Sequence, residues 1–273
     1  MIVCLIIHGR ILGVIKPMDW DSRATLGDKA GTDDLIAKWL EIEAIAKYVK
    51  DGMRVLDVGC GNGQTLIELA RRYDITGFGI DTSEKMITAA FQNLYGQKKR
   101  GGVTFDIRDV LDLNALFEER AHLRGPFDLV YSERCLINLP DWETQKRAIR
   151  NIVSVLKPAG IYLMCENSQD GLEYVNRLRQ CVGLSDIAPP AHNRYLRETE
   201  VEQFAEANRC GLTLDGKARF GSTYAFLSRV VNAYLAQQEG KEPDYDSPIN
   251  RLALKLPPIG EMGQYTLWRW RKE

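Results

Sequence analysis

The sequence predicts an α/β protein with a doubly wound, mostly parallel sheet of seven strands and a helical cap. Its 273 residues are 45% hydrophobic and carry a formal net charge of −1, an ordinary composition for a globular chain. Between residues 32 and 166, short runs that are apolar throughout alternate with helical patterns. Such strands are typical of parallel sheets that helices cover on both faces.

The expected elements follow one another regularly from residue 32. The polar residues 32–34 indicate a helix start, and the helix that follows is expected to pack through Leu35, Trp39, Ile42, Ala46 and Val49. Strands are expected at 53–59, 75–81, 103–109, 127–133 and 160–166, and helices at 64–73, from 83, and at 142–156. Right-handed crossovers between such strands place helices on both faces of the sheet.

The pattern changes after residue 166. Helices are expected at 171–182, 198–208 and 222–238, and strands at 212–219 and 265–272, the last alternating like an edge strand. The main domain is expected over 32–273, with insertions at about 167–197 and 222–262 that cap the sheet, after an N-terminal extension over 1–31. The apolar run 1–15 is interpreted as an extra strand or an upstream start codon, with a membrane anchor as the alternative, although it is too short for a span.

Charge and cysteine usage narrow the class of protein. The 36 Lys and Arg residues balance 37 Asp and Glu residues, so bulk charge provides no attraction to nucleic acid or anionic lipid. The six cysteines, at positions 4, 60, 135, 165, 181 and 210, form no C-x-x-C pair. They are expected to be small buried hydrophobes in a reducing, cytoplasmic compartment, and no histidine pair has the spacing of a metal site.

The most informative stretch is DVGCGNG, residues 57–63, between an expected strand and an expected helix. Alternate glycines let the backbone turn sharply and approach a ligand, and the helix start offers free N–H groups. A nicotinamide-binding fingerprint would need G-x-G-x-x-G. Its third glycine would fall at Gln64 or Leu66, so a nicotinamide oxidoreductase is rejected.

This stretch resembles motif I of the class I S-adenosylmethionine-dependent methyltransferases. Further segments resemble the family in order: GFGIDTSEKMITAA with Asp81, VTFDIRDV with Asp109, FDLVYSERCLINL, and IVSVLKPAGIYLMCE, in which Ala159 replaces the family's usual glycine. The resemblance implies a Rossmann-like methyltransferase fold, S-adenosylmethionine as the methyl donor, and no metal.

The resemblance also implies a donor site, residue by residue. The alternate glycines would cradle the methionine part, while Asp57 would fix the loop and reach the amino group directly or through water. Asp81 would hold the ribose, and Asp109 would read the adenine together with the next amide. The full set of expected donor contacts is Asp57, Gly59, Cys60, Gly61, Gly63, Asp81, Thr82, Met86, Asp109, Val110 and Ser132.

The implied reaction is an in-line displacement at the sulfonium methyl, in which alignment and exclusion of water matter most. A hydroxyl acceptor would need a base. Candidates are Glu133 after the fourth strand, Glu166 after the fifth and His192 in the cap, with a solvated or ion-paired acid and a structural histidine as the alternatives. Residues that could orient an acceptor, or be structural, are Arg134, Asn138 and Tyr195.

The expected acceptor is a small molecule. Neither a nucleic acid nor a membrane is expected as a partner. The segments NRLRQCVGL and AHNRYL are loosely similar to methyltransferases of bacterial surface-polysaccharide biosynthesis, which favours a sugar-like hydroxyl. The alternatives are a protein or nucleic-acid methyltransferase and a non-catalytic donor-binding scaffold. The aromatic, arginine-rich tail is either an acceptor cap using Tyr224 and Arg229 or a homodimer interface. Trp39 and Tyr48 are expected in the core, with donor-lid contacts as the alternative.

Overall fold

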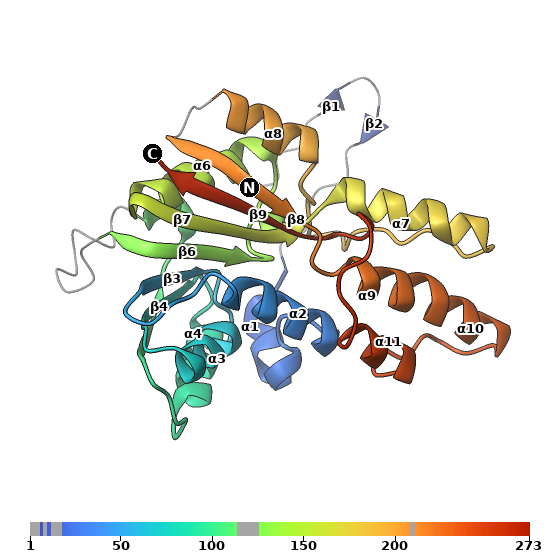
Figure 1. The fold of residues 1–273 in the computed structure, drawn as a ribbon, viewed down its shortest axis with the longest axis horizontal. Helices are drawn as coiled ribbons and strands as arrows, with labels where there is room; N and C mark the ends of the chain where they lie inside the picture. Colours follow the sequence, from blue (N-terminus) through green and yellow to red (C-terminus); the bar gives the residue numbers. More distant parts are fainter. Residues whose placement is uncertain (1–5, 8–9, 12–17, 114–125, 208–210) are drawn as a thin grey trace.

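A seven-stranded sheet forms the centre of the computed structural model, which describes residues 6–7, 10–11, 18–113, 126–207 and 211–273 (Figure 1). The strand order is β5-β4-β3-β6-β7-β9-β8, and only β9 runs antiparallel to its neighbours. The strands are β3 (Arg54–Val58), β4 (Thr76–Asp81), β5 (Gly102–Ile107), β6 (Phe127–Glu133), β7 (Leu156–Asn167), β8 (Leu212–Ala218) and β9 (Tyr265–Lys272). The expected doubly wound, mostly parallel sheet is confirmed.

Helices cover both faces of the sheet, and several of them begin at a polar N-terminal cap. The caps Asp34, Ser83, Asp141 and Ser168 each accept a hydrogen bond from a first-turn amide. One face carries α2 (Leu35–Ala46), α3 (Gln64–Arg72) and α4 (Glu84–Leu94); the other carries α6 (Trp142–Ser154) and α8 (Glu198–Glu206). Each face encloses its own hydrophobic cluster.

A helical layer extends beyond the ends of the parallel strands (Figure 1). It contains α7 (Gln169–Cys181), α9 (Ser222–Phe226), the π-helical turn η5 (Leu227–Asn232), α10 (Ala233–Gln238) and α11 (Pro248–Ala253). These are the segments predicted to cap the sheet. Near the N-terminus lie α1 (Trp20–Arg23), the 3-10 helix η1 (Ala24–Lys29) and a separate hairpin of β1 (Ile6–Ile7) and β2 (Arg10–Ile11). The rest of the run 1–15 lies outside the described residues.

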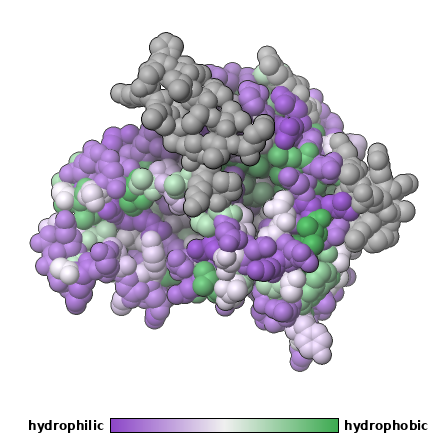
Figure 2. All heavy atoms as spheres, turned by 180° about the vertical axis from the view of Figure 1, so that it is seen from behind, coloured by the Kyte–Doolittle hydropathy of each residue, from purple (hydrophilic) through white to green (hydrophobic). Residues whose placement is uncertain are grey.

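The surface is mixed in character. Figure 2 shows one face on which hydrophilic residues predominate and hydrophobic residues form small, separate patches. Among the residues that the structure describes, no helix is both long and apolar enough to cross a bilayer.

The expected edge position of the last strand is wrong. β9 lies between β7 and β8, and β8 is the edge strand. The alternation of β9 reflects two different faces: Trp268 and Trp270 are fully buried on one side. On the other side, the half-buried Arg269 and the exposed Arg271 both bond with Asp215 of the neighbouring β8. Period-two patterning alone therefore could not separate an edge strand from a central antiparallel one.

The predicted apolar face of α2 is partly wrong. Ile42, Ala46 and Val49 are buried as expected, but Leu35 and Trp39 are 42% and 43% exposed. The ring of Trp39 lies beneath the Arg72 guanidinium, 5.1 Å from it, and takes no part in the core or in a donor lid. Apolar residues occur around most of this helix, so the sequence could not select the packed side.

The buried side of α2 is instead formed mainly by Ile36, Ala37, Ile42, Ala44 and Ile45. Tyr48 packs against the core.

The cysteine prediction holds for part of the set. All described cysteines are free: Cys60 and Cys165 are buried and Cys135 is half-buried, whereas Cys181 is exposed at the end of α7. Cys4 and Cys210 lie outside the described residues.

Candidate active site

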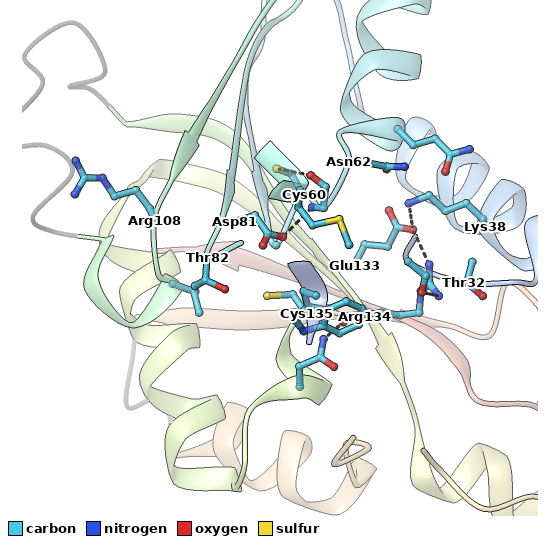
Figure 3. A pocket seen from close by; sticks show the side chains of 18 of the residues that line it. Thr32, Lys38, Cys60, Asn62, Asp81, Thr82, Arg108, Glu133, Arg134 and Cys135 are labelled. Atoms are coloured by element: carbon cyan, nitrogen blue, oxygen red, sulfur yellow. Dashed lines mark hydrogen bonds and ion pairs between the residues drawn. The ribbon is translucent and has the colours of Figure 1, made fainter. Parts of the chain in front are cut away.

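A cavity of about 310 Å³ opens where β3, β4, β5 and β6 end (Figure 3). In parallel sheets, ligands bind at this edge, beside the turns that follow the strands. Most of the predicted donor contacts line this cavity, together with one candidate base: Gly59, Cys60, Gly61, Asp81, Thr82, Met86, Asp109, Val110 and Glu133. Because the sequence predicts donor contacts at this place, we refer to it as the donor cavity.

The glycines of the first turn have different physical roles. All three adopt a left-handed conformation, with φ of 75° at Gly59, 52° at Gly61 and 77° at Gly63. A Cβ at Gly59 would lie 2.5 Å from the Cys135 sulfur, and one at Gly63 would lie 2.6 Å from the Phe105 ring. Beside Gly61 there is open space, so this glycine permits close approach of a ligand. Gly63 packs the start of α3 and does not line the cavity.

Asp81 connects the turns after β3 and β4. One carboxylate oxygen accepts the Gly61 N–H at 2.9 Å, and the other accepts the Ser83 N–H at 2.9 Å. Burial raises the pKa of Asp81, and these bonds oppose that shift. Asp109, two residues beyond the end of β5, accepts the Leu111 N–H at 2.8 Å and begins a short 3-10 turn. Both carboxylates therefore stand at fixed positions on the cavity wall.

Glu133 is held as an anion by a buried network. Lys38 Nζ lies 2.6 Å from one carboxylate oxygen (Figure 3). The Thr65 hydroxyl donates to the other oxygen at 2.6 Å. Burial alone would raise the pKa of Glu133, but the charges of Lys38 and Arg134 outweigh it and lower the pKa to about 2. A carboxylate this acidic does not accept a proton near neutral pH.

The neighbouring Glu41 completes this network from α2. Its side chain is almost fully buried, and its carboxylate lies 3.1 Å from Arg134 Nε. Burial raises the pKa of Glu41 well above its usual value. Lys38 and Arg134 thus face the two buried carboxylates of Glu133 and Glu41 beside the donor cavity.

Glu166 does not reach either cavity. Its side chain is 1% exposed, and its oxygens accept three backbone N–H groups, from Cys135, Leu136 and Ile137, at 3.0–3.3 Å. Burial raises the pKa of Glu166 to about 7, against the effect of these bonds. The carboxylate shapes the turn after β6, so the predicted role as a base for the acceptor is not supported by its position.

Two predicted donor contacts also lie below the cavity surface. Ser132 is fully buried and shares a 2.9 Å hydrogen bond with the Tyr162 hydroxyl. Asp57 is buried under the glycine turn, where desolvation and the nearby Glu133 charge raise its pKa to about 8. Neither lines the donor cavity, so both are placed to support the turn.

A second cavity of about 290 Å³ adjoins the first. The two share five lining residues: Trp20, Gly31, Thr32, Arg134 and Asn138. Other lining residues come from the predicted cap and the start of β9, including His192, Tyr195, Arg229, Gln264 and Tyr265. We call it the acceptor-side cavity.

His192 is the one predicted base that faces the acceptor-side cavity. The edge of its ring meets Trp20, with ring centroids 5.8 Å apart. Burial and, to a lesser degree, Arg23 lower the pKa of His192 from 6.5. The imidazole is therefore mainly neutral at physiological pH, the state that a general base requires.

A buried ion pair connects the start of α2 to the cap. Asp34 accepts the Tyr224 hydroxyl at 2.6 Å and pairs with Arg229, which also donates to the Tyr265 hydroxyl at 2.8 Å. Arg229 and Tyr265 line the acceptor-side cavity, whereas Tyr224 lies beneath it. Arg229 therefore belongs to the cavity lining, as the cap interpretation requires, and Tyr224 supports it from below.

Sequence reasoning missed several cavity residues. Lys38 and Trp20 precede motif I and carry no pattern that marks them, and Gln264 stands alone before β9. Arg134 was considered only as an acceptor contact, yet it lines both cavities and has a left-handed backbone (φ 51°), uncommon outside glycine. That strain is visible only in the folded chain.

The comparison with known families agrees with this geometry. The family model described as "Methyltransferase domain" matches residues 49–208. The chain belongs to this methyltransferase family. The match contains the glycine turn, Asp81, Asp109 and the turn after β6, and its start at residue 49 leaves out Lys38 and Asp34.

Several curated methyltransferases are similar to this chain in sequence. The 27-O-demethylrifamycin SV methyltransferase of Amycolatopsis mediterranei (strain S699) is 31% identical over 67% of this chain and 64% of its own length. The demethylmenaquinone methyltransferase of Desulfitobacterium hafniense (strain Y51) is 30% identical over 60% of this chain and 67% of its own. Other curated relatives are matched over as little as 21% of their length.

A solved S-adenosylmethionine-dependent methyltransferase from Methanosarcina mazei has the same fold. Its TM-score is 0.53 at 17% identity, with 84% of this methyltransferase chain and 96% of the other covered.

Proposed function

We propose that this methyltransferase transfers the methyl group of S-adenosylmethionine to a hydroxyl of a small molecule, with a sugar or sugar-like compound as the acceptor. The observation that carries the proposal is the pair of adjoining cavities. One lies on the glycine turn typical of donor binding, and the other lies under the cap, with Arg134 and Asn138 between them. An in-line methyl transfer needs two ligands in contact, held away from water.

In this proposal the donor lies along the edge of the sheet. Its adenine is placed beside Asp109 and Met86, and its ribose hydroxyls beside Asp81. Its methionine end rests against Gly61, where no side chain intervenes. Lys38 and Arg134 line the same cavity and would attract the donor carboxylate, because cations draw an anion into a cleft.

The base in this proposal is His192. It lines the acceptor-side cavity, and its lowered pKa leaves it neutral and able to remove the hydroxyl proton as the methyl is transferred. Glu133 is too acidic for this role and Glu166 is bonded to the backbone. When bound, the donor supplies an already activated methyl group, so the remaining task of the chain is alignment.

Two further points support the class of acceptor. The relatives named above are methyltransferases of two different small molecules, which supports a small-molecule acceptor without selecting one. The lining of the acceptor-side cavity is rich in amide, hydroxyl and charged groups, which suits a polar acceptor. The free state of the described cysteines is in keeping with the reducing cytoplasm as the proposed compartment.

Calorimetry and a methyl-transfer assay test the function. The purified protein is titrated with S-adenosylmethionine, S-adenosylhomocysteine and NAD, and the first two are expected to bind. The protein is then given methyl-labelled donor with nucleotide-sugars, amines, RNA or protein, and label is expected in the first set. Binding of NAD without binding of the sulfonium donor would refute the proposal, and label confined to RNA or protein would refute the acceptor class.

A further inference from the structure

Gln264 differs from the other buried amide side chains. It is 7% exposed, its Oε1 has no hydrogen-bond partner, and within the described residues its Nε2 forms no bond either. Gln264 lines the acceptor-side cavity. A buried amide without partners is uncommon, because its desolvation is not compensated.

The contrast with the rest of the chain is direct. Asn62 donates to the Gly27 carbonyl at 2.9 Å, and Gln145 donates to two carbonyls at 3.0 Å. Asn232 donates to the Asp244 carbonyl at 3.0 Å. Asn167 and Asn250, the other buried amides in the described chain, each form a side-chain hydrogen bond as well, although the Oδ1 of Asn250 has no partner. Among these buried amides, Gln264 is the one whose side chain is bonded at neither end.

The backbone holds Gln264 at a defined place. Its carbonyl accepts the Ser168 N–H at 2.8 Å, and the preceding Gly263 has a φ of 100° that few other residues adopt. A second unengaged amide lines the same cavity: the Oδ1 of Asn193 has no partner, while its backbone N–H donates to Pro190 at 2.8 Å. Two amides on separate segments are thus fixed by their backbones and free at their side chains.

The hydrogen-bonding groups of a side-chain amide determine which ligand groups it can bind. Each amide offers one accepting oxygen and a donating NH₂ group side by side, and a hydroxyl both donates and accepts. Two hydroxyls on neighbouring carbons can satisfy both ends of one amide, whereas a single hydroxyl leaves one end unpaired. The rings of Tyr195 and Tyr265 in the same lining provide flat apolar surface for the carbon skeleton.

We propose that the acceptor-side cavity selects acceptors with at least two neighbouring hydroxyl groups, and that Gln264 and Asn193 are the side chains that determine this specificity. The inference rests on the proposed function and names the feature of the acceptor that the site reads. It makes Gln264 a specificity residue, separate from the donor site and from the base.

A matched set of small alcohols tests the inference. Methyl-labelled S-adenosylmethionine is supplied with cis- and trans-1,2-cyclohexanediol and methyl β-D-glucopyranoside, and in parallel with cyclohexanol and 1,4-cyclohexanediol, whose hydroxyls are single or far apart. The vicinal diols and the glucoside are expected to be methylated about 10-fold more efficiently, because each lost hydrogen bond to a buried amide costs roughly this factor.

The variant Gln264→Leu keeps the side-chain size and removes both hydrogen-bonding ends. It is expected to raise KM for the vicinal diols about 10-fold and to erase the preference over cyclohexanol, with S-adenosylhomocysteine affinity unchanged. Asn193→Leu is expected to act in the same direction. The control Gln92→Leu, on the exposed side of α4, keeps the preference.

The outcomes separate this inference from the proposed function. Equal methylation of vicinal diols and single alcohols, a retained preference in Gln264→Leu, or donor binding without transfer to any probe would each overturn the inference. Failure of the proposed function is seen earlier and independently, as absence of donor binding in the calorimeter.

Discussion

The donor cavity and the acceptor-side cavity are built in different ways. The donor cavity is formed largely by turns that directly follow strands, so residues within short motifs supply most of its lining. The acceptor-side cavity gathers side chains from both ends of the chain, such as Asp34 and Arg229, which are 195 residues apart. The first depends on local backbone geometry, and the second depends on tertiary packing. This difference predicts how each responds to substitution.

The largest expected effect is on chemistry. His192→Gln is expected to lower kcat by about 10²–10⁴-fold, as for loss of a general base, with donor affinity unchanged. Because the pKa of His192 is lowered from 6.5, wild-type activity should fall only as the pH drops through a value below 6.5, where the imidazole becomes charged. The pH profile of kcat measures this, and an unchanged acidic limb in the variant would contradict the assignment.

The next largest effect is expected on the free energy of unfolding, through the buried ion pair beside the acceptor-side cavity. Asp34→Asn keeps the α2 cap but leaves Arg229 as an unpaired buried cation, and should lower the free energy of unfolding by about 3–5 kcal/mol. The double variant Asp34→Asn/Arg229→Met removes both charges and should recover much of the loss. Denaturant unfolding measures both, and equal stability of the two variants would argue against a charge effect.

A smaller and more local effect is expected in the donor cavity. Asp81→Ala removes the acceptor of the Gly61 N–H and the proposed ribose bonds, and should weaken donor binding by about 1.5–3 kcal/mol per charge-assisted bond. Calorimetry with S-adenosylhomocysteine measures the loss. Asp106→Ala, on neighbouring β5, is the comparison variant and should bind normally, since it does not line the cavity. Unchanged affinity of Asp81→Ala would remove the ribose role.

The smallest effect is expected for an exposed residue of α2, and it tests which side of this helix packs in the core. Trp39→Ala should cost only about 0.5–1 kcal/mol, the loss of an exposed contact with Arg72. Ile45→Ala on the buried side should cost about 2–5 kcal/mol because it leaves a cavity in the core. Thermal unfolding compares the two, and a large effect at Trp39 would restore the rejected core assignment.

The sequence predicted the two regions to different extents. The described residues 53–113 and 126–133 could be read almost element by element, because strand, turn and helix signals there are local and the glycine motif indicates where a ligand approaches. The K-P-A-G segment is a related case: Ala159 has a φ of 60°, so the turn needs the left-handed conformation for which the family's usual glycine is better suited.

Other features could not be predicted because they are decided by contacts between distant residues. Glu133 was a reasonable base from its position after β6, but Lys38, 95 residues earlier in the chain, makes it strongly acidic. Glu166 was an equally reasonable candidate, but its carboxylate binds backbone N–H groups of the turn after β6. Burial of polar groups such as Glu41 and Gln264 likewise depends on which elements meet, and no pattern in their neighbours indicates it.

The reversed direction of β9 has a further consequence. β8 and β9 form an antiparallel pair, and the whole segment from 219 to 264 is the excursion between them, leaving and rejoining the sheet at the edge where ligands bind. Such an excursion can be lengthened, shortened or exchanged while both strands keep their partners. An exchange of this segment that keeps the sheet must still preserve the packing of Tyr224 and the Asp34–Arg229 pair, which tie it to α2.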